Sequence, residues 1–371
     1  MRILVVSTPV GCLGSGQGGG VELTAASLVA GLLERGHRLT VLAGEGSRLP
    51  QGCGAAELWG EAGVGQPSWQ HRSREAPVEI PAGGLLPRLW RRALAEQHRF
   101  DVLLNLAYDW LPLWLTPHTR TPLLHLVSMG SVGEAMDGVI AEIARSHPHH
   151  LAFHTAAQAA DFDLPGPPHL VGNGFDLARY HFRGQPRQQL GWAGRIAPEK
   201  GLEDAAAVAA RLGLPLRVWG LREDEAYARR VEASVPAGTI EWRGFLPTER
   251  MQEELGHCAA LLNTPKWNEA FGNVVVEAMA CGVPVAAYAR GGPAELVQEG
   301  VNGALAAPDD LEALQAAVER ARALPRGGAR RWAEQHCSRA AFAARIEDWI
   351  RLATVGRPGI PTGGPSVPSR K

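Results

Sequence analysis

The stretch PKWNEAFGNVVVEAMACGVPVAAYARGGPAELV, residues 265–297, contains the pattern that decides the fold. The apolar run AALLNT ends just before it at residue 264, and a second run, VPVAAY, covers residues 283–288. The residues between these two runs have the composition of a helix that begins near Gly272. A strand, a helix and a strand in this order form a βαβ unit, which indicates a parallel sheet.

Further units of this kind extend through most of the chain. The apolar runs predict strands at 2–7, 38–43, 101–107, 122–128 and 150–155, and a second series at 190–196, 216–220, 240–245, 259–264 and 283–288. Helices are predicted at 21–37, 85–98 and 339–353, whereas residues 44–82 form a long excursion with weak periodicity. Two such series predict two doubly wound domains, joined near residues 176–188.

The composition excludes several classes of protein. A length of 371 residues predicts two to three domains, and 37 basic against 38 acidic residues give a net charge of −1. No overall positive field is available to attract a nucleic acid. No apolar run is long enough for an integral membrane segment. Five scattered cysteines and an N-terminus that resembles a buried strand favour a cytoplasmic protein without disulfides.

Two glutamates flank the start of the helix in the opening stretch. Gly272 and Asn273 begin this helix, so its free N–H groups and positive dipole end face an anion. Glu269 precedes the helix and can reach beyond the anion, and Glu277 lies about one and a half turns along it. A diphosphate with a sugar on one side and a ribose on the other fits this spacing, because carboxylate oxygens accept hydrogen bonds from vicinal hydroxyls.

A glycine-rich loop follows the first strand. Gly14, Gly16 and Gly19 have the G-x-G-x-x-G spacing of dinucleotide-binding loops. The fingerprint begins late after the strand, and the ribose-binding acid it requires could only be Glu45. Three interpretations stay open: a nicotinamide or flavin site, a loop without a ligand, and a loop whose amides approach an anionic ligand.

Several motifs together resemble one family of enzymes. EAFGNVVVE (269–277) is similar to the E-x7-E motif of family 4 of the retaining glycosyltransferases, which have the two-domain GT-B fold. GGGVELTAASLVAGLLERGH (18–37), GNGFDLARY (172–180) and GRIAPEKGLEDA (194–205) resemble further family motifs. The motifs AYDWLPL, GNGFDL and TPKW with EAFGN resemble the cyanobacterial UDP-glucose:tetrahydrobiopterin glucosyltransferases in particular.

The resemblance implies an α/β protein with two Rossmann-like, doubly wound domains that face a central cleft. Residues 1–177 are expected to form the acceptor-side domain and residues 178–338 the nucleotide-sugar donor domain. The C-terminal helix, at about 339–354, is expected to cross back to the first domain, and residues 355–371 to be a disordered tail. The activity implied is transfer of glucose from UDP-glucose, with retention, to a small hydroxylated acceptor, most of all tetrahydrobiopterin.

The resemblance also implies roles for residues on the donor side. Catalytic roles fall to Glu269, Arg195 and Lys200, because the two cations would neutralise the departing diphosphate and Glu269 would bind the transferred sugar. Donor-binding roles fall to Gly19, Gly20, Phe271, Gly272, Asn273 and Glu277. Fixed cations and a helix N-terminus would replace a metal, so no metal ligand and no cofactor are expected.

The assignment of acceptor-binding residues depends mainly on the resemblance. The candidates for acceptor binding are Glu22, Tyr108, Asp109, Trp110, Ser128 and Lys266. Asp109 follows a strand between two aromatic residues, where a carboxylate could meet the N–H edge of a pterin; Asp137 competes for this role. Ser128 stands where the wider family commonly has a histidine, and the nearby His125 is expected to pack in the sheet.

Other functions remain open from the sequence. The acceptor could be a lipid or a polysaccharide, or the chain could bind sugar nucleotides without catalysis. DFD (161–163) resembles the metal motif of other glycosyltransferases, and HPHH (147–150) resembles a metal cluster. Both are interpreted as loops, because neither has the strand-end position that such a metal site requires.

Overall fold

The computed structural model describes residues 1–15 and 20–355 and contains two separate parallel sheets. The first has the order β3-β2-β1-β4-β5-β6-β7 and the second the order β10-β9-β8-β11-β12-β13. The first sheet comprises β1 (Arg2–Val6), β2 (Arg38–Gly44), β3 (Glu57–Glu61), β4 (Val102–Asn105), β5 (Leu123–Val127), β6 (Leu151–Phe153) and β7 (His169–Leu170). The second comprises β8 (Leu190–Ala193), β9 (Leu216–Trp219), β10 (Ile240–Gly244), β11 (Ala260–Asn263), β12 (Val285–Tyr288) and β13 (Gly303–Ala306).

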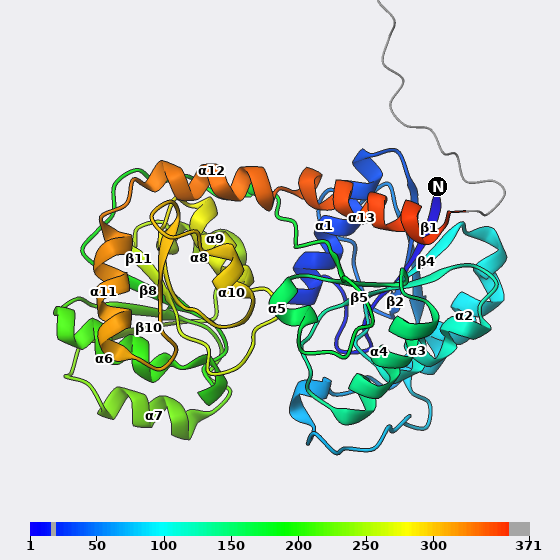
Figure 1. The fold of residues 1–371 in the computed structure, drawn as a ribbon, viewed down its shortest axis with the longest axis horizontal. Coiled ribbons are helices and arrows are strands. Elements are labelled where there is room, and N and C mark those ends of the chain that lie inside the picture. The colour runs from blue at the N-terminus through cyan, green and yellow to red at the C-terminus, as the bar shows by residue number, and fades with distance from the viewer. Residues whose placement is uncertain (16–19, 356–371) are drawn as a thin grey trace, which may run out of the picture.

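Helices cover both sheets and form two lobes (Figure 1). The first lobe contains α1 (Gly20–Glu34), α2 (Leu85–Glu96), α3 (Trp110–Leu115), α4 (Glu134–Ser146) and α5 (Ala156–Ala159). The second contains α6 (Leu202–Leu212), α7 (Glu225–Ala233), α8 (Thr248–Leu255), α9 (Asn273–Ala280), α10 (Gly291–Leu296), α11 (Leu311–Arg322) and α12 (Arg326–His336). None of the described helices has both the length and the apolar character that crossing a membrane requires.

The predicted two-domain architecture is confirmed, but the sequence missed three strands. β3 forms one edge of the first sheet inside the predicted excursion, and Trp59 is the one buried residue in its sequence ELWGE. β7 contains two residues, too few for a visible pattern. β13 has the sequence GALA, whose small residues lack the β-branched character of a typical strand.

The last helix, α13 (Arg339–Ala353), returns to the first lobe as predicted. It continues the direction of α12 from one lobe to the other (Figure 1). Phe342, Ile346, Trp349 and Ile350 are buried in the core beneath the first sheet, together with side chains of α1. α1 allows this contact because it has Gly31 at the crossing, where an added Cβ would lie 2.7 Å from Ala343 Cβ. The absence of a side chain at Gly31 therefore sets the distance between α1 and α13.

We expect Gly31→Ala to destabilise the protein by about 1–3 kcal/mol, because the added methyl group overpacks the crossing of α1 and α13. Gly138→Ala is the matched control: Gly138 lies inside α4, and an added Cβ there has nothing within 4 Å. The control should gain up to about 1 kcal/mol from helix propensity. Chemical denaturation of both variants measures the difference, and equal effects would contradict the packing argument.

Candidate functional site

The loops that follow β8 and β11 are joined at the carboxyl edge of the second sheet. These strands are neighbours at the point where the strand order reverses, which is where open α/β sheets bind ligands. Thr264 Oγ1 donates to the carbonyl of Gly201 at 2.7 Å, and Lys266 N donates to the carbonyl of Glu199 at 2.8 Å. Gly201 has a left-handed φ of 64°, and a Cβ there would lie 2.0 Å from Thr264 O. Only glycine allows the two loops to approach this closely.

This junction brings together two of the three predicted catalytic residues. Lys200 Nζ lies 2.7 Å from Glu269 Oε1, and the two side chains are 16% and 18% exposed. The ammonium group also lies 5.2 Å from the centroid of the Trp267 ring. Both charged groups are thus partly shielded from water but remain accessible to a ligand.

The third predicted catalytic residue, Arg195, is held by acidic neighbours. Its guanidinium group pairs with Glu199 at 2.8 Å and also with Glu223. Arg195 follows β8 and its side chain is 29% exposed, so it lies at the same sheet edge as Lys200. An anion that binds Arg195 must exchange with one of these carboxylates.

Two helices begin close together on the other side of this site. α9 begins at Asn273, after Gly272 with a left-handed φ of 96°, and a Cβ on Gly20 of α1 would lie 2.7 Å from Asn273 Nδ2. Asn173 Nδ2 donates to Asn273 Oδ1 at 2.8 Å and to Thr24 Oγ1 at 3.0 Å. Two positive helix ends from different lobes therefore face one region. Phe271 is buried and stacks on Phe175, which fixes the entry to α9.

Glu277 lies inside the second lobe and is only 5% exposed. Tyr180 Oη donates to its Oε1 at 3.0 Å. Burial raises the pKa of Glu277 to about 7, and the hydrogen bond from Tyr180 acts in the opposite direction. Tyr180 and Asn173 were not predicted as site residues, although both lie in the quoted motif GNGFDLARY.

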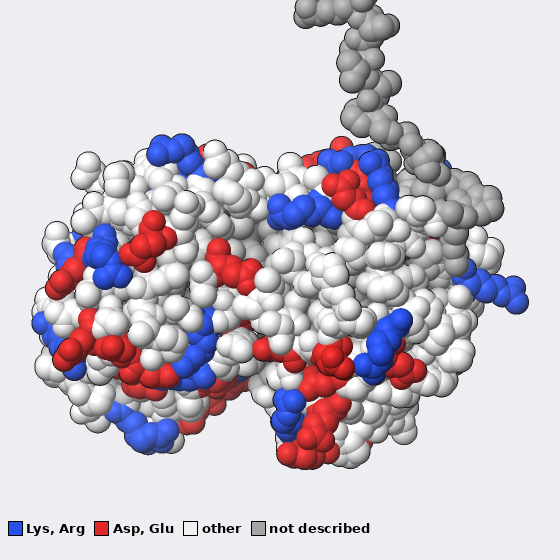
Figure 2. Space-filling view, viewed as in Figure 1, with Lys and Arg blue, Asp and Glu red and all other residues white. Residues whose placement is uncertain are grey.

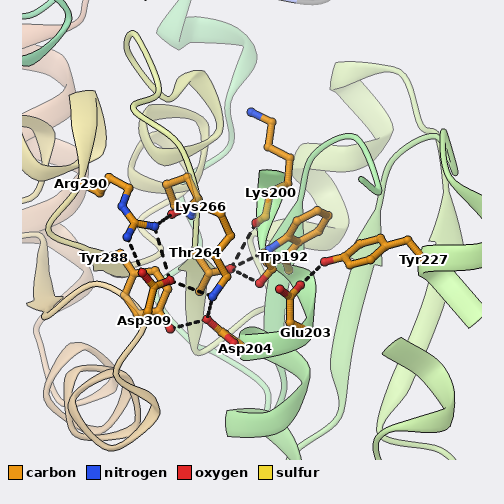
Figure 3. A network of polar contacts seen from close by, with 12 residues as sticks. Trp192, Lys200, Glu203, Asp204, Tyr227, Thr264, Lys266, Tyr288, Arg290 and Asp309 are labelled. Atoms are coloured by element: carbon orange, nitrogen blue, oxygen red, sulfur yellow. Dashed lines mark hydrogen bonds and ion pairs between the residues drawn. The ribbon is translucent and has the colours of Figure 1, made fainter. Parts of the chain in front are cut away.

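Lys266 does not present its ammonium group to an acceptor. It pairs with Asp204 and with Asp309, the latter at 2.9 Å, and Arg290 binds the other oxygen of Asp309 (Figure 3). Burial acts to lower the pKa of Lys266, but the bonds to both carboxylates outweigh it, and the pKa is raised. In Figure 3 the side chain of Lys200 extends away from this network, whereas Lys266 points into it. The prediction that Lys266 binds an acceptor is not supported.

The predicted contact between Asp109 and an acceptor is not supported either. Asp109 is buried; its Oδ2 accepts a hydrogen bond from Trp69 Nε1 at 3.2 Å, and its Oδ1 caps α3 by accepting from Leu111 N at 3.3 Å. Burial raises the pKa of Asp109, opposed by the bond from Trp69. The neighbouring Trp110 stacks on Trp114 with ring centroids 5.7 Å apart. Asp109 thus has a structural role at the start of α3.

The remaining acceptor candidates lie in different surroundings. Glu22 accepts hydrogen bonds from Gly14 N and Ser15 Oγ, at 2.8 and 2.9 Å, and so holds the part of the glycine-rich loop that the structure describes. Ser128 is half-buried directly after β5. Tyr108 Oη donates to Gly130 O at 3.0 Å. Gly19 lies outside the described residues.

Asp137 and His125 also have partners within the first lobe. Asp137 Oδ2 accepts from Ser131 Oγ and pairs with Arg74, both at 2.7 Å. His125 is buried between Asn105 and Thr116, and burial lowers its pKa to about 3. The prediction that His125 packs in the sheet is confirmed.

Comparison with known proteins supports one family. Residues 181–350 match the family of glycosyl transferases group 1. The matched segment covers the second lobe and most of α13. The 2-deoxystreptamine N-acetyl-D-glucosaminyltransferase of Streptomyces fradiae is 33% identical over 172 residues, which are 44% of this chain and 38% of that protein. The phosphatidyl-myo-inositol mannosyltransferase of Propionibacterium freudenreichii is 28% identical over 301 residues, covering 72% and 73%.

The whole described chain also has the fold of such proteins. The structure of Anabaena HepE in complex with UDP-glucose aligns with a TM-score of 0.71 at 19% identity, covering 95% of this chain and all of that one. This likeness confirms the GT-B fold. The matched segment contains Arg195, Lys200, Glu269 and Glu277, whereas Glu22 and Asp109 lie outside it. The chain spans less than half the length of the first curated relatives it matches.

The buried carboxyl group of the second lobe predicts a pH dependence. Because the folded-state pKa of Glu277 is raised above the ordinary 4.5 to about 7, its contribution to stability is present below pH 4.5 and lost as the pH rises through 7. Glu277→Gln removes this titration and can still accept the bond from Tyr180. We expect the melting temperature of the variant, relative to the unchanged protein, to rise between pH 5 and pH 8. Glu312→Gln, on the exposed start of α11, should show no such trend.

Proposed function

We propose that this protein is a retaining glycosyltransferase that transfers glucose from UDP-glucose to a small hydroxylated acceptor. One observation carries the proposal: the Lys200–Glu269 pair lies at the carboxyl edge of the second sheet, within the segment that matches the group 1 family. A cation and a carboxylate side by side suit a ligand that joins a diphosphate to a hydroxyl-rich sugar.

The site residues have two proposed roles: some stabilise the charge of the diphosphate, and others bind the hydroxyl groups of the donor. Lys200 and Arg195 stabilise the negative charge that develops on the diphosphate as its bond to the sugar breaks. The N-terminus of α9 adds peptide N–H groups for the same anion. Glu269 accepts hydrogen bonds from hydroxyls of the sugar, and Glu277 accepts them from the ribose. When the donor binds, its diphosphate replaces Glu269 as the partner of Lys200 and replaces the carboxylates of Glu199 and Glu223 at Arg195. This exchange arranges the charged groups around the substrate.

The proposed donor and the proposed acceptor rest on different observations. HepE, which shares the fold, binds UDP-glucose, and this favours the same donor. For the acceptor, tetrahydrobiopterin remains the choice that the sequence resemblance favours, but without the proposed bond from Asp109. The five cysteines are free thiols, in keeping with the proposed cytoplasmic location.

Two rival functions make different predictions. A lipid acceptor is favoured by the phosphatidyl-myo-inositol mannosyltransferase among the relatives. A sugar-nucleotide binding protein without catalysis would bind UDP-glucose and release no UDP from it. An acceptor screen with UDP-glucose that measures UDP release, and includes tetrahydrobiopterin and phosphatidylinositol vesicles, separates these functions.

We expect Lys200→Ala to lower turnover by roughly 10²–10³-fold, because it removes one of two cations that face the diphosphate. Arg195→Ala should behave similarly, and the double variant should lose less than the product of both effects, since both cations serve one site. Arg211→Ala, exposed on α6, is the control for loss of a positive charge and should retain turnover. Circular dichroism checks folding, and a near-normal rate for Lys200→Ala would place the diphosphate elsewhere.

We also expect chelation to leave most of the activity, because fixed cations perform the role that a divalent metal has in other transferases. The measurement compares initial rates before and after dialysis against EDTA. Complete loss that manganese or magnesium restores would show that the two side chains are insufficient to neutralise the diphosphate.

A further inference from the structure

A cavity of about 270 Å³ lies where the two lobes meet. It is lined by Gly130, Ser131, Val132, Asp161, Trp267 and Asn268. The first four belong to the segments that follow β5 and α5 in the first lobe, and the last two to the loop after β11 in the second. The cavity therefore requires both lobes.

The cavity adjoins the proposed donor site. Trp267 contributes to its wall, and the Lys200 ammonium group lies 5.2 Å from the centroid of the Trp267 ring. Asn268, also in the wall, directly precedes Glu269. A molecule bound in the cavity lies close to the residues to which we assign the diphosphate and the transferred sugar.

The wall from the first lobe is held in place by buried hydrogen bonds. Gln158 is 1% exposed, and its Nε2 donates to Val127 O at 2.8 Å and to Met129 O at 2.9 Å. The Tyr108 hydroxyl donates to Gly130 O at 3.0 Å. The Gln158 bonds join α5 to the end of β5 and to the loop after it, and the Tyr108 bond holds the same loop. The position of this wall is thus fixed before a ligand binds.

The cavity has acidic character. Asp161 is the one charged residue among those that line it; its Oδ1 accepts from Asn268 Nδ2 at 3.0 Å, and it forms no ion pair with a Lys or Arg of the described chain. On the face shown in Figure 2, both acidic and basic side chains border the groove between the lobes. Two cations lie beside lining residues, but both have carboxylate partners: Arg74 donates to Ser131 and pairs with Asp137, and Lys200 pairs with Glu269. The charged group that lines the cavity itself is therefore the Asp161 carboxylate, which repels a phosphate group and accepts from an N–H donor.

We propose that this cavity binds the acceptor and that Asp161 selects acceptors with N–H donors over phosphorylated ones. The proposal rests on the proposed function, since the cavity is an acceptor site only if the neighbouring residues bind a donor. The expected acceptor is an amine, or a heterocycle with an amino edge, that also carries the reacting hydroxyl. Such a ligand places its N–H groups against the Asp161 carboxylate and its apolar part against the Trp267 ring.

The test compares Asp161→Asn with Asp163→Asn. Asp163 lies two residues along the same segment, pairs with Arg145 at 3.1 Å and is 84% exposed, so the same chemical change occurs outside the cavity. Calorimetric titrations of the full chain, with and without UDP, use 2-deoxystreptamine, tetrahydrobiopterin, myo-inositol and inositol 3-phosphate as probes. UDP is titrated separately into every variant.

We expect the two N–H-bearing probes to bind more tightly than myo-inositol, and inositol 3-phosphate to bind most weakly. Asp161→Asn should weaken the N–H-bearing probes by about tenfold or more, because a charge-assisted hydrogen bond is lost; Asp163→Asn should change them less than about twofold. UDP affinity should be the same in all three proteins.

Three results would overturn the acceptor proposal: tightest binding of inositol 3-phosphate, equal effects of the two substitutions, or no binding of either N–H-bearing probe. Absence of UDP binding in the unchanged protein would contradict the proposed function instead.

Discussion

The close approach of Gly201 to Thr264 is the constraint on which the site depends. The loop after β8 contains Lys200 and the loop after β11 leads to Glu269, so the distance between these two side chains is set by how near the loops can come. A side chain at Gly201 would overlap the Thr264 carbonyl, since a Cβ would lie 2.0 Å from that oxygen. Separating the loops would also break the Thr264–Gly201 and Lys266–Glu199 hydrogen bonds. The pairing of Lys200 with Glu269 thus follows from backbone geometry.

The two lysines of this region illustrate how packing assigns different roles to one residue type. Lys266 is surrounded by Asp204, Asp309 and the ring of Tyr288, and so neutralises charge inside the second lobe. Lys200 has one carboxylate partner and extends away from that network. A phosphate that takes the place of Glu269 at Lys200 would therefore leave the ion pairs of Lys266 intact.

Much of the fold and part of the site could be predicted from the sequence. The period of apolar residues located the central strands, and Gly272 with Asn273 identified the start of α9. The roles of Asp109 and Lys266 could not be predicted, because they depend on partners that only the folded chain brings near: Trp69 for the first, Asp204 and Asp309 for the second. For the same reason Asp161, whose surroundings include Asn268 of the other lobe, had the sequence appearance of an ordinary loop acid.

Several polar contacts between the lobes involve the parts that surround the site. Thr155 Oγ1 donates to Ala270 O at 2.8 Å, Asn173 binds Asn273, and Glu295 of α10 accepts from the first backbone amides of α5. Each bond joins a residue of the first lobe to a segment adjoining Glu269 or α9. Polar groups of this kind can exchange protein partners for water or ligand at small net cost. The distance between the lobes and the geometry of the site are therefore coupled, because the segments that would contact a donor also hold the lobes together.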